Sequence, residues 1–320
     1  MTARVIQGAV WVAVATAANA ASAEPGDGAV VERDVIEVGA PQGRSLHEVA
    51  VDNRLGDVHI VGGDRESARV VAIKRAPDRE LIERLKVTLT PDPSGVLYID
   101  TAVAEGEGTV PMPAEAVALD LVIETPRDMH ARVDIWRGRV RARDLDAGAE
   151  LAASRGDIEV ENVAGPVTAR LVRGEQAFRV IFGAVDARGV EGEIVLHTVR
   201  GERLGVALHD GDVRGHGVAA DELSILTTRG DIHLRGEATG GGLLQIASHE
   251  GSLDVRLEAE GPLALRASSR RGAVDVTGAG VRGGMASPGR YLGVVPGDGD
   301  PALVELSSRI GNVRFAVVQP

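Results

Sequence analysis

Apolar and polar residues alternate in short segments along most of the chain, and a glycine precedes each segment. Strict alternation over four to six residues is typical of a half-buried β-strand. A glycine before a strand suits a corner that needs positive φ or a close backbone approach. The pattern begins at ten positions: Gly56, Gly138, Gly156, Gly174, Gly192, Gly211, Gly230, Gly251, Gly272 and Gly311. The copy at Gly174 is irregular, because Gln176 occupies its apolar position.

The spacing of these glycines is regular. From Gly138 onwards, successive glycines are separated by 18, 18, 18, 19, 19, 21, 21 and 39 residues. A unit of this size cannot bury its own apolar face, but a stack of such units can. The chain is therefore predicted to be all-β, a single-stranded β-solenoid with 18–21 residues per turn and strands about 4.8 Å apart. The 39-residue interval predicts one or two turns with an exposed loop.

The alternation also predicts an aliphatic core, in which each fully buried side chain contributes about 1.5–3 kcal/mol. Only seven residues are aromatic, which fits a narrow and evenly layered interior. The expected core residues are Val140, Ile158, Val160, Ile194, Leu196, Val213, Ile232, Leu234, Leu253, Val255, Val274, Val276, Val313 and Phe315.

The N-terminal part repeats less clearly. It has strand-like stretches at 48–51, 70–73, 96–99 and 118–123, and a short helix is expected after Asp78 as N-cap. An uncovered solenoid end exposes unpaired strand edges, so we expect this part to cover one end. The predicted organisation is a signal peptide at 1–23, a capping and early-coil segment at 24–135, and solenoid repeats at 136–320, the last two forming one continuous structural domain.

The first residues resemble an export signal. Arg4 precedes an apolar stretch from Val5 to Ala18, and Ala21-Ser-Ala23 is a small-residue cleavage site, with an alternative after Ala20. The stretch is shorter than the roughly 20 residues that span a bilayer, and no later segment is long and apolar enough to do so. We therefore expect an exported protein, in the periplasm or on the cell surface.

Composition narrows the chemistry. The chain has 35 Lys and Arg against 47 Asp and Glu, for a net charge of −12, and it has no cysteine. The missing cysteines exclude disulfides, thiol nucleophiles and thiolate metal sites. The acidic balance argues against a nucleic-acid surface, which needs clustered cations.

Two ladders of polar side chains are predicted on the outside of the stack. An acidic ladder directly follows the corner glycines, and Arg155, Arg173 and Arg229 would neutralise part of it. Its oxygens are also weak Ca²⁺ candidates. The acidic residues are Asp157, Glu175, Glu193, Asp212 and Asp231.

A more basic ladder lies five residues after the glycines, interrupted by Glu161. Its members are Arg143, Arg179, His197, His216, Arg235 and Arg256. His197 and His216 should be stacked neighbours, but a third metal ligand is not evident on that face. The ladder is interpreted either as a solvated surface or as a surface that faces an anionic glycan or lipid head group.

Evidence for catalysis is sparse. Asp254 and Asp275 share a position in the repeat, and in adjacent turns their carboxyl groups would have the separation of a retaining glycosidase. Sugar-binding aromatic residues are scarce, however, and no P-loop, nucleophile elbow or HExxH motif is present. No cofactor is expected.

Three segments resemble a known family. They are Leu119-Asp-Leu-Val-Ile-Glu-Thr-Pro126, Trp136-Arg-Gly-Arg-Val140 and Ala153-Ser-Arg-Gly-Asp-Ile-Glu-Val-Glu-Asn-Val163. They are similar to the bacterial family called "putative adhesin", and the likeness covers roughly residues 45–320. The resemblance implies an exported, right-handed β-helix of unknown function, and it supplies no catalytic residues.

The preferred hypothesis is a non-enzymatic, adhesin-like binding or scaffold module of the bacterial envelope. Its partner would be an envelope glycan or another envelope protein. The alternatives are a polysaccharide-active β-helix enzyme and a Ca²⁺-stabilised structural module.

Overall fold

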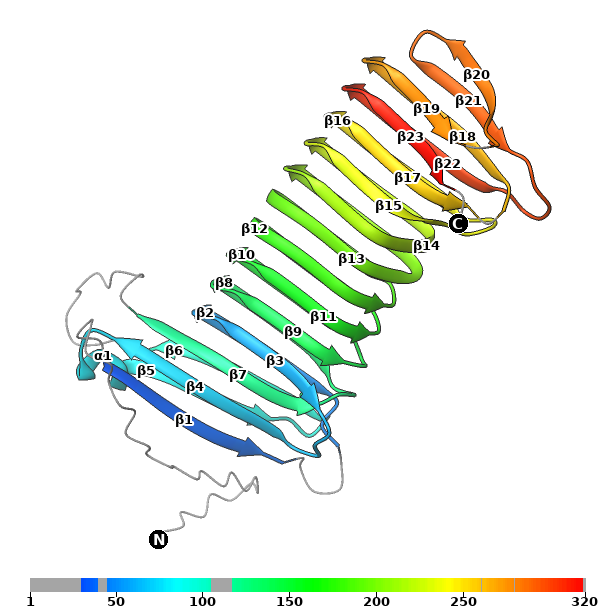
Figure 1. The fold of residues 1–320 in the computed structure, drawn as a ribbon. Helices are drawn as coiled ribbons and strands as arrows, with labels where there is room; N and C mark the ends of the chain where they lie inside the picture. Colours follow the sequence, from blue (N-terminus) through cyan, green and yellow to red (C-terminus); the bar gives the residue numbers. More distant parts are fainter. Residues whose placement is uncertain (1–29, 40–44, 105–116, 260, 279, 319–320) are drawn as a thin grey trace.

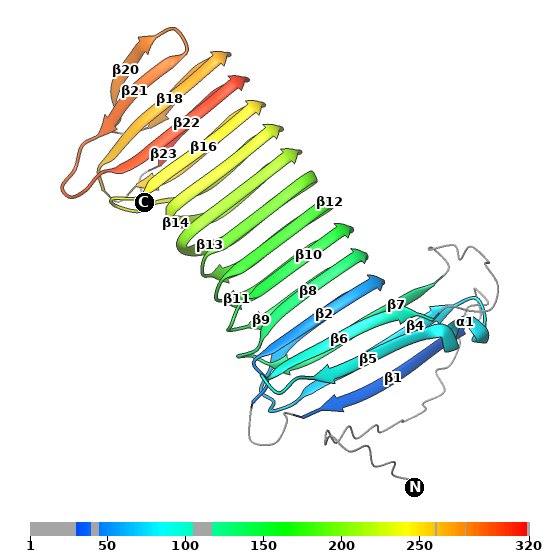
Figure 2. The same ribbon diagram turned by 180° about the vertical axis from the view of Figure 1, so that it is seen from behind.

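The computed structural model describes residues 30–39, 45–104, 117–259, 261–278 and 280–318. The predicted signal peptide at 1–23 lies outside these residues. The described chain forms a long row of stacked turns (Figure 1), and the view from behind shows the same row on its other side (Figure 2). Each regular turn contributes one strand to each of two opposed faces, so the predicted β-solenoid is confirmed.

The first face consists of the strands that precede the corner glycines. Its spatial order is β5 (Leu85–Pro91), β6 (Val96–Val103), β2 (Glu48–Leu55), β8 (His130–Arg137), β10 (Ala149–Arg155), the first part of β12 (Val167–Phe182), both ends of β13 (Val185–Asp210), the end of β14 (Val213–Arg229), β16 (Leu243–Glu250), β22 (Ala302–Ile310), β18 (Leu263–Arg271), β21 (Arg290–Val295) and β20 (Arg282–Ser287).

The second face consists of the strands that follow the glycines. Its order is β1 (Val30–Val38), β4 (Ala68–Ala76), β7 (Ala118–Pro126), β3 (Val58–Gly63), β9 (Val140–Leu145), β11 (Ile158–Ala164), the end of β12, the middle of β13, the start of β14, β15 (Ile232–Ala238), β17 (Leu253–Ala259), β23 (Val313–Val318) and β19 (Val274–Gly278).

The ten predicted corner glycines form one continuous column between the two faces. A Cβ added at any of them would lie 1.6–2.3 Å from a backbone oxygen of a neighbouring turn. Eight of the ten also have φ between +124° and +145°, a region that disfavours L side chains. Gly251 and Gly272 have no positive φ, so only the close approach of the neighbouring backbone requires glycine there. The corners therefore need glycine because the turns pack backbone against backbone.

The turns at the C-terminal end do not stack in chain order. Gly311 contacts Gly251, and Gly272 in turn contacts Gly311, so the last turn of the sequence is inserted between two earlier ones. The 39-residue interval contains the β20–β21 hairpin, which pairs with β18 at the end of the stack. Because β19 occupies the terminal turn, Val274 and Val276 are only partly buried. Their assignment to the core was wrong; the other predicted core residues are buried.

The N-terminal end shows the same kind of insertion. The turn formed by β2 and β3 lies between β6–β7 and β8–β9, and Gly56 joins the corner column. Antiparallel strands β1, β4 and β5 extend the two faces beyond it. The predicted helix is α1 (Arg79–Arg84). Asp78 caps it by accepting the Leu81 backbone N–H at 2.8 Å, and Ile82 is buried.

Buried polar side chains lie mostly beside the corners, where they satisfy the backbone. The hydroxyls of Ser248, Ser308 and Ser269 donate to corner-glycine carbonyls at 2.7–3.0 Å. Gln176, in its apolar position, is buried and donates to the Arg188 carbonyl at 2.8 Å. It fits because Gly189, close by in the next turn, has no side chain.

Candidate functional site

The basic ladder lies along the second face in the predicted order. Strand pairing places Arg143, Glu161, Arg179, His197, His216, Arg235 and Arg256 beside one another in successive turns. The imidazole rings of His197 and His216 are stacked, with centroids 5.5 Å apart and planes inclined by 13°. The period alone therefore predicted which polar side chains would be neighbours on this face.

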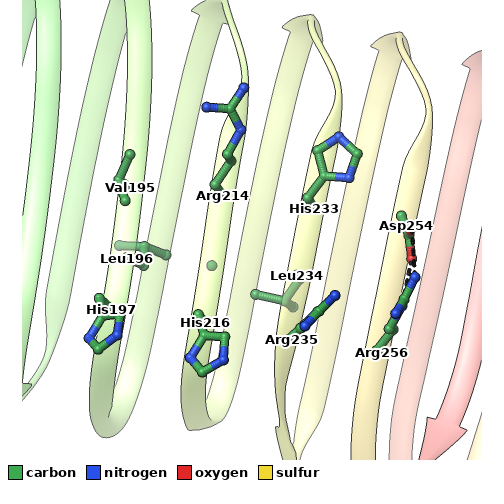
Figure 3. Close-up of a pocket in the computed structure, with 11 residues that line it drawn as sticks. Val195, Leu196, His197, Arg214, His216, His233, Leu234, Arg235, Asp254 and Arg256 are labelled. Atoms are coloured by element: carbon green, nitrogen blue, oxygen red, sulfur yellow. Dashed lines mark hydrogen bonds and ion pairs between the residues drawn. The ribbon is translucent and has the colours of Figure 1, made fainter.

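A second outward column runs beside the ladder, two residues earlier on each strand. In the same turns it contains Val195, Arg214, His233 and Asp254. Between the two columns lies a shallow hollow of about 230 Å³ (Figure 3). We call it the cationic furrow. It is bounded on one side by His197, His216, Arg235 and Arg256, and on the other by Val195, Arg214, His233 and Asp254.

The furrow combines side chains that are already paired with side chains that are free to donate a hydrogen bond. Arg256 contacts Asp254 at 3.3 Å on its own strand, and Arg214 pairs with Glu193 and Asp212. His216, Arg235 and His233 have no hydrogen bond or ion pair with any described residue. Among the described residues that line the hollow, Asp254 is the only one with a carboxylate. An anion in the furrow would therefore find donors that no other described side chain occupies.

The acidic ladder has a structural role. The carboxylate of Asp157 accepts the backbone N–H of Glu175 in the next turn at 3.1 Å. Asp212 does the same for Asp231 at 2.9 Å, and Asp231 for Ser252 at 2.7 Å. These acids satisfy backbone donors at the corners. Throughout the described part of the chain, no three His, Asp or Glu side chains gather in a way that could hold a metal ion.

The expected neutralisation of the acidic ladder by the arginines before the glycines was wrong. Arg173 pairs with Glu191 at 2.5 Å, and Arg229 donates to Asp210 at 2.9 Å. These partners precede the glycine, as the arginines do, and therefore lie on the first face. The cations near the acids follow the glycines instead. Arg139, at the corner, is 3.7 Å from Asp157, and Arg214, on the second face, is 3.6 Å from Asp212.

The proposed carboxylate pair does not form. Asp254 and Asp275 do share a column, but both are paired with Arg314, which lies in the turn between them. They are thus two strand spacings apart, about 9–10 Å. The insertion of β22 and β23 separates them, so the geometry of a retaining glycosidase is absent at this position.

The pKa values of two partly buried side chains, His59 and Asp134, are shifted by groups on the two faces. Burial lowers the pKa of His59, helped by the charges of Arg143 and Arg141, and its Nε2 has no hydrogen-bond partner. Burial raises the pKa of Asp134, and the carboxylate of Asp52 in the adjacent strand adds to the shift.

Two sets of surface residues were missed because only some positions of the repeat were followed from turn to turn. Arg214 and His233 lie three residues after their glycines. Exposed Trp136, Val172 and Val190 lie two residues before theirs, on the first face. The same 18-residue spacing, applied to every position of the repeat, identifies both sets.

Residues 29–279 match the family model described as Toastrack DUF4097. The chain belongs to this family. Toastrack DUF4097 membership agrees with the β-solenoid observed, and with the resemblance found in the sequence to a "putative adhesin" family of unknown function. No curated protein matches the sequence. Within the described residues, no helix has the length and apolar character that crossing a membrane requires.

Solved structures similar to this Toastrack DUF4097 chain are distant. A "putative adhesin" from Parabacteroides merdae is 10% identical, with a TM-score of 0.43, covering 90% of this chain and 96% of that one. A "putative adhesin" from Bacteroides fragilis is 13% identical, with a TM-score of 0.38 and coverages of 89% and 97%. A "putative lipid binding protein" from Parabacteroides distasonis is 12% identical, with a TM-score of 0.42 and coverages of 89% and 96%.

Proposed function

We propose that this protein is a non-enzymatic binding module of the bacterial cell envelope that holds an anionic partner in the cationic furrow. The observation that carries the proposal is the run of His197, His216, Arg235 and Arg256 in four successive turns, facing Arg214 and His233. Charged donors at a site with few competing carboxylates form the stronger class of hydrogen bonds with anionic groups.

The shape of the furrow favours a linear polymer over a small molecule. The hollow is shallow and open, whereas small-molecule sites bury most of their ligand. Its donors repeat once per turn, about 4.8 Å apart, along a straight column. A polysaccharide with carboxylate, sulfate or phosphate groups at regular intervals would meet one donor after another, so an anionic envelope glycan is the proposed partner.

Binding would be measured by calorimetry with polygalacturonate as the probe. Replacing Arg235 and Arg256 by glutamine removes two adjacent cations of the furrow, and we expect roughly tenfold weaker binding. The matched control replaces Arg203 and Arg266, two exposed arginines of the first face. Its affinity should stay within about twofold of the original. Equal losses in both variants would show a non-specific charge effect and refute the furrow.

The proposal also places the protein outside the cytoplasm, based on the export signal expected at 1–23. Protease added to intact host cells, followed by blotting for the protein, distinguishes the cell surface from the periplasm. Digestion in intact cells would indicate the surface, where adhesion is the leading role. Protection until the outer membrane is opened would indicate the periplasm and a scaffold role. A cytoplasmic protein would contradict export.

A further inference from the structure

The first face carries a column whose charge changes sign along the stack. The column contains the residues four positions before the corner glycines, together with Asp100, which pairs with Asp52. We call it the sign-change column. In stacking order it is Asp100, Asp52, Asp134, Ala152, Arg170 and Arg188. Three acids are followed by one small residue and then by two cations.

A second column two residues further along each strand is largely apolar. Trp136 is 60% exposed, Val172 53% and Val190 46%, with Ser154 between the tryptophan and the first valine. We call this the apolar column. Large apolar side chains at such exposure are unusual in a row, and contiguous exposed apolar surface marks interaction sites.

Between the two columns lies a hollow of about 360 Å³. Its lining includes Ala152, Ser154, Arg170, Val172 and Val190. The hollow exists because Ala152 and Ser154 are small while the side chains around them are long. Trp136 lies just outside it, one strand away from Ser154.

Each column can pair with the same column of a second copy when the two copies are aligned at Ala152 and Ser154. A two-fold axis along strand β10 reverses the stacking direction while preserving the strand direction. It would set Asp134 of one copy opposite Arg170 of the other, and Asp52 opposite Arg188. The same operation sets Trp136 opposite Val172, at the edge of the partner's hollow. One rotation therefore matches the charges and brings Trp136 to the partner's hollow, while Val190 faces Arg54, the neighbour of Trp136 in the apolar column.

We infer that the first face binds a second copy of this chain, in an antiparallel, two-fold symmetric dimer centred on strand β10. Such an isologous interface uses the same patch on both subunits, which is the commonest arrangement among homo-oligomers. It lies on the opposite face from the cationic furrow and does not depend on the proposed function.

The monomer leaves the acidic half of the sign-change column uncompensated. Asp100, Asp52 and Asp134 have no ion pair with any described residue, and like charges directly opposite one another in a sheet are destabilising. The raised pKa of Asp134, caused by burial and by Asp52, reflects that environment. Cations of a second copy would offset the repulsion between these carboxylates.

The cationic half can change partners at little cost. Arg170 contacts Glu150 at 2.9 Å and Arg188 contacts Asp186 at 3.0 Å, and all four side chains are at least 43% exposed. Exposed pairs of this kind contribute little to stability. The guanidinium groups can therefore turn to a partner's carboxylates, or bridge both.

The size of the interface predicts a modest affinity. The strands from β6 to the end of β13, three on either side of β10, lie about 4.8 Å apart and are each about 20 Å long, which gives a face of roughly 600 Å² per partner. The total of about 1,200 Å² is at the lower limit for specific interfaces. We expect a reversible dimer that forms at micromolar concentrations.

The test is a charge-swap experiment by sedimentation velocity over a range of concentrations. One variant carries D52R and D134R, and the other carries R170D and R188D. Each should be monomeric alone, because its own copies would oppose like charges. An equimolar mixture should dimerise, because every facing pair then has opposite charges. Thermal melting of each variant alone verifies that it is folded.

Three results would overturn the inference. The original chain could stay monomeric up to several hundred micromolar; it could dimerise without regard to either substitution; or two folded variants could fail to associate when mixed. A further variant, Trp136→Ser, keeps all charges and should weaken the original dimer at least tenfold. If the dimer of this variant is as stable as the original, the apolar column is not part of the interface.

Cross-linking tests the position of the axis. The chain has no cysteine, so S154C introduces a single thiol at the proposed axis. Facing sheets lie about 10 Å apart, so a short bis-maleimide should link two copies through this position. V195C, on the second face, is the matched control and should remain unlinked. Equal linking of both variants would contradict the axis.

Discussion

Replacing corner Gly156 by alanine tests the reason for the repeat. Its φ is +124°, and an added Cβ would lie 1.8 Å from the carbonyl oxygen of Gly138 in the adjacent turn. Carbon and oxygen atoms essentially never approach below 3.0 Å in this way. The two turns would have to separate locally by about 1.2 Å, the difference between these distances.

Two costs follow from that separation. An L side chain in this region of φ costs about 1–3 kcal/mol. Moving the turns apart also breaks the hydrogen bonds that the Gly138 and Val140 N–H groups donate to the carbonyls of Arg155 and Asp157, which are 3.0 and 2.8 Å long. A buried backbone group left without a partner costs about 1–3 kcal/mol. We expect a loss of about 4 kcal/mol in the free energy of unfolding, from these two sources together.

The assay is urea denaturation followed by circular dichroism, with hydrogen exchange to locate the weakened turns. Gly205→Ala is the control, because Gly205 has no positive φ and an added Cβ there has no neighbour closer than 3.9 Å. It should be neutral or stabilise by up to about 1 kcal/mol. The reasoning is refuted if the two variants lose similar stability, or if Gly156→Ala loses less than about 1 kcal/mol.

Further predictions concern a valine at positive φ, pH, the buried hydroxyls and metal removal. Val180 has φ of +56°, so Val180→Asn should raise the free energy of unfolding by about 1 kcal/mol, and an unchanged melting temperature would refute strain there. The pKa of His59 is lowered in the fold, so the unfolded chain binds more protons; stability should be full above pH about 6.5 and fall below it. His59→Gln should flatten that melting profile, and an unaltered profile would exclude His59 as the cause. Ser308→Ala removes the donor to the Gly251 carbonyl and should cost about 1 kcal/mol in denaturant titrations, whereas no loss would mean that water replaces it. A chelator should leave the melting temperature unchanged, because the acidic ladder is used by backbone N–H groups; a clear fall would revive the Ca²⁺ hypothesis.

The sequence predicted most of the fold because the repeat is nearly one-dimensional. Residues 18 to 21 positions apart occupy equivalent places in neighbouring turns, so alternation alone separated inward from outward positions. For the same reason His197 and His216 were expected to stack, and they do. The helix after Asp78 was predictable from local capping chemistry.

The candidate site was only partly predictable. The basic ladder followed from the period, but the furrow also needs Arg214 and His233, which stand in a neighbouring column. Which arginine pairs with which acid could not be read from spacing either. Arg173 precedes its glycine and lies on the first face, so it meets Glu191 and not the acids across the corner.

What the sequence by itself determined is the turn: its length, its two strands, its corner glycine and the inward side chains. These follow from local periodicity and from backbone contacts that admit no Cβ. What only the tertiary structure decided is which turns are neighbours at the two ends. The last turn enters the stack between two earlier ones, where Val304, Leu306 and Phe315 are buried from both sides. Strand pairing and burial set that order, and a repeat pattern contains no information about it; this is why Asp254 and Asp275, equivalent in the repeat, are separated by Arg314 in the fold.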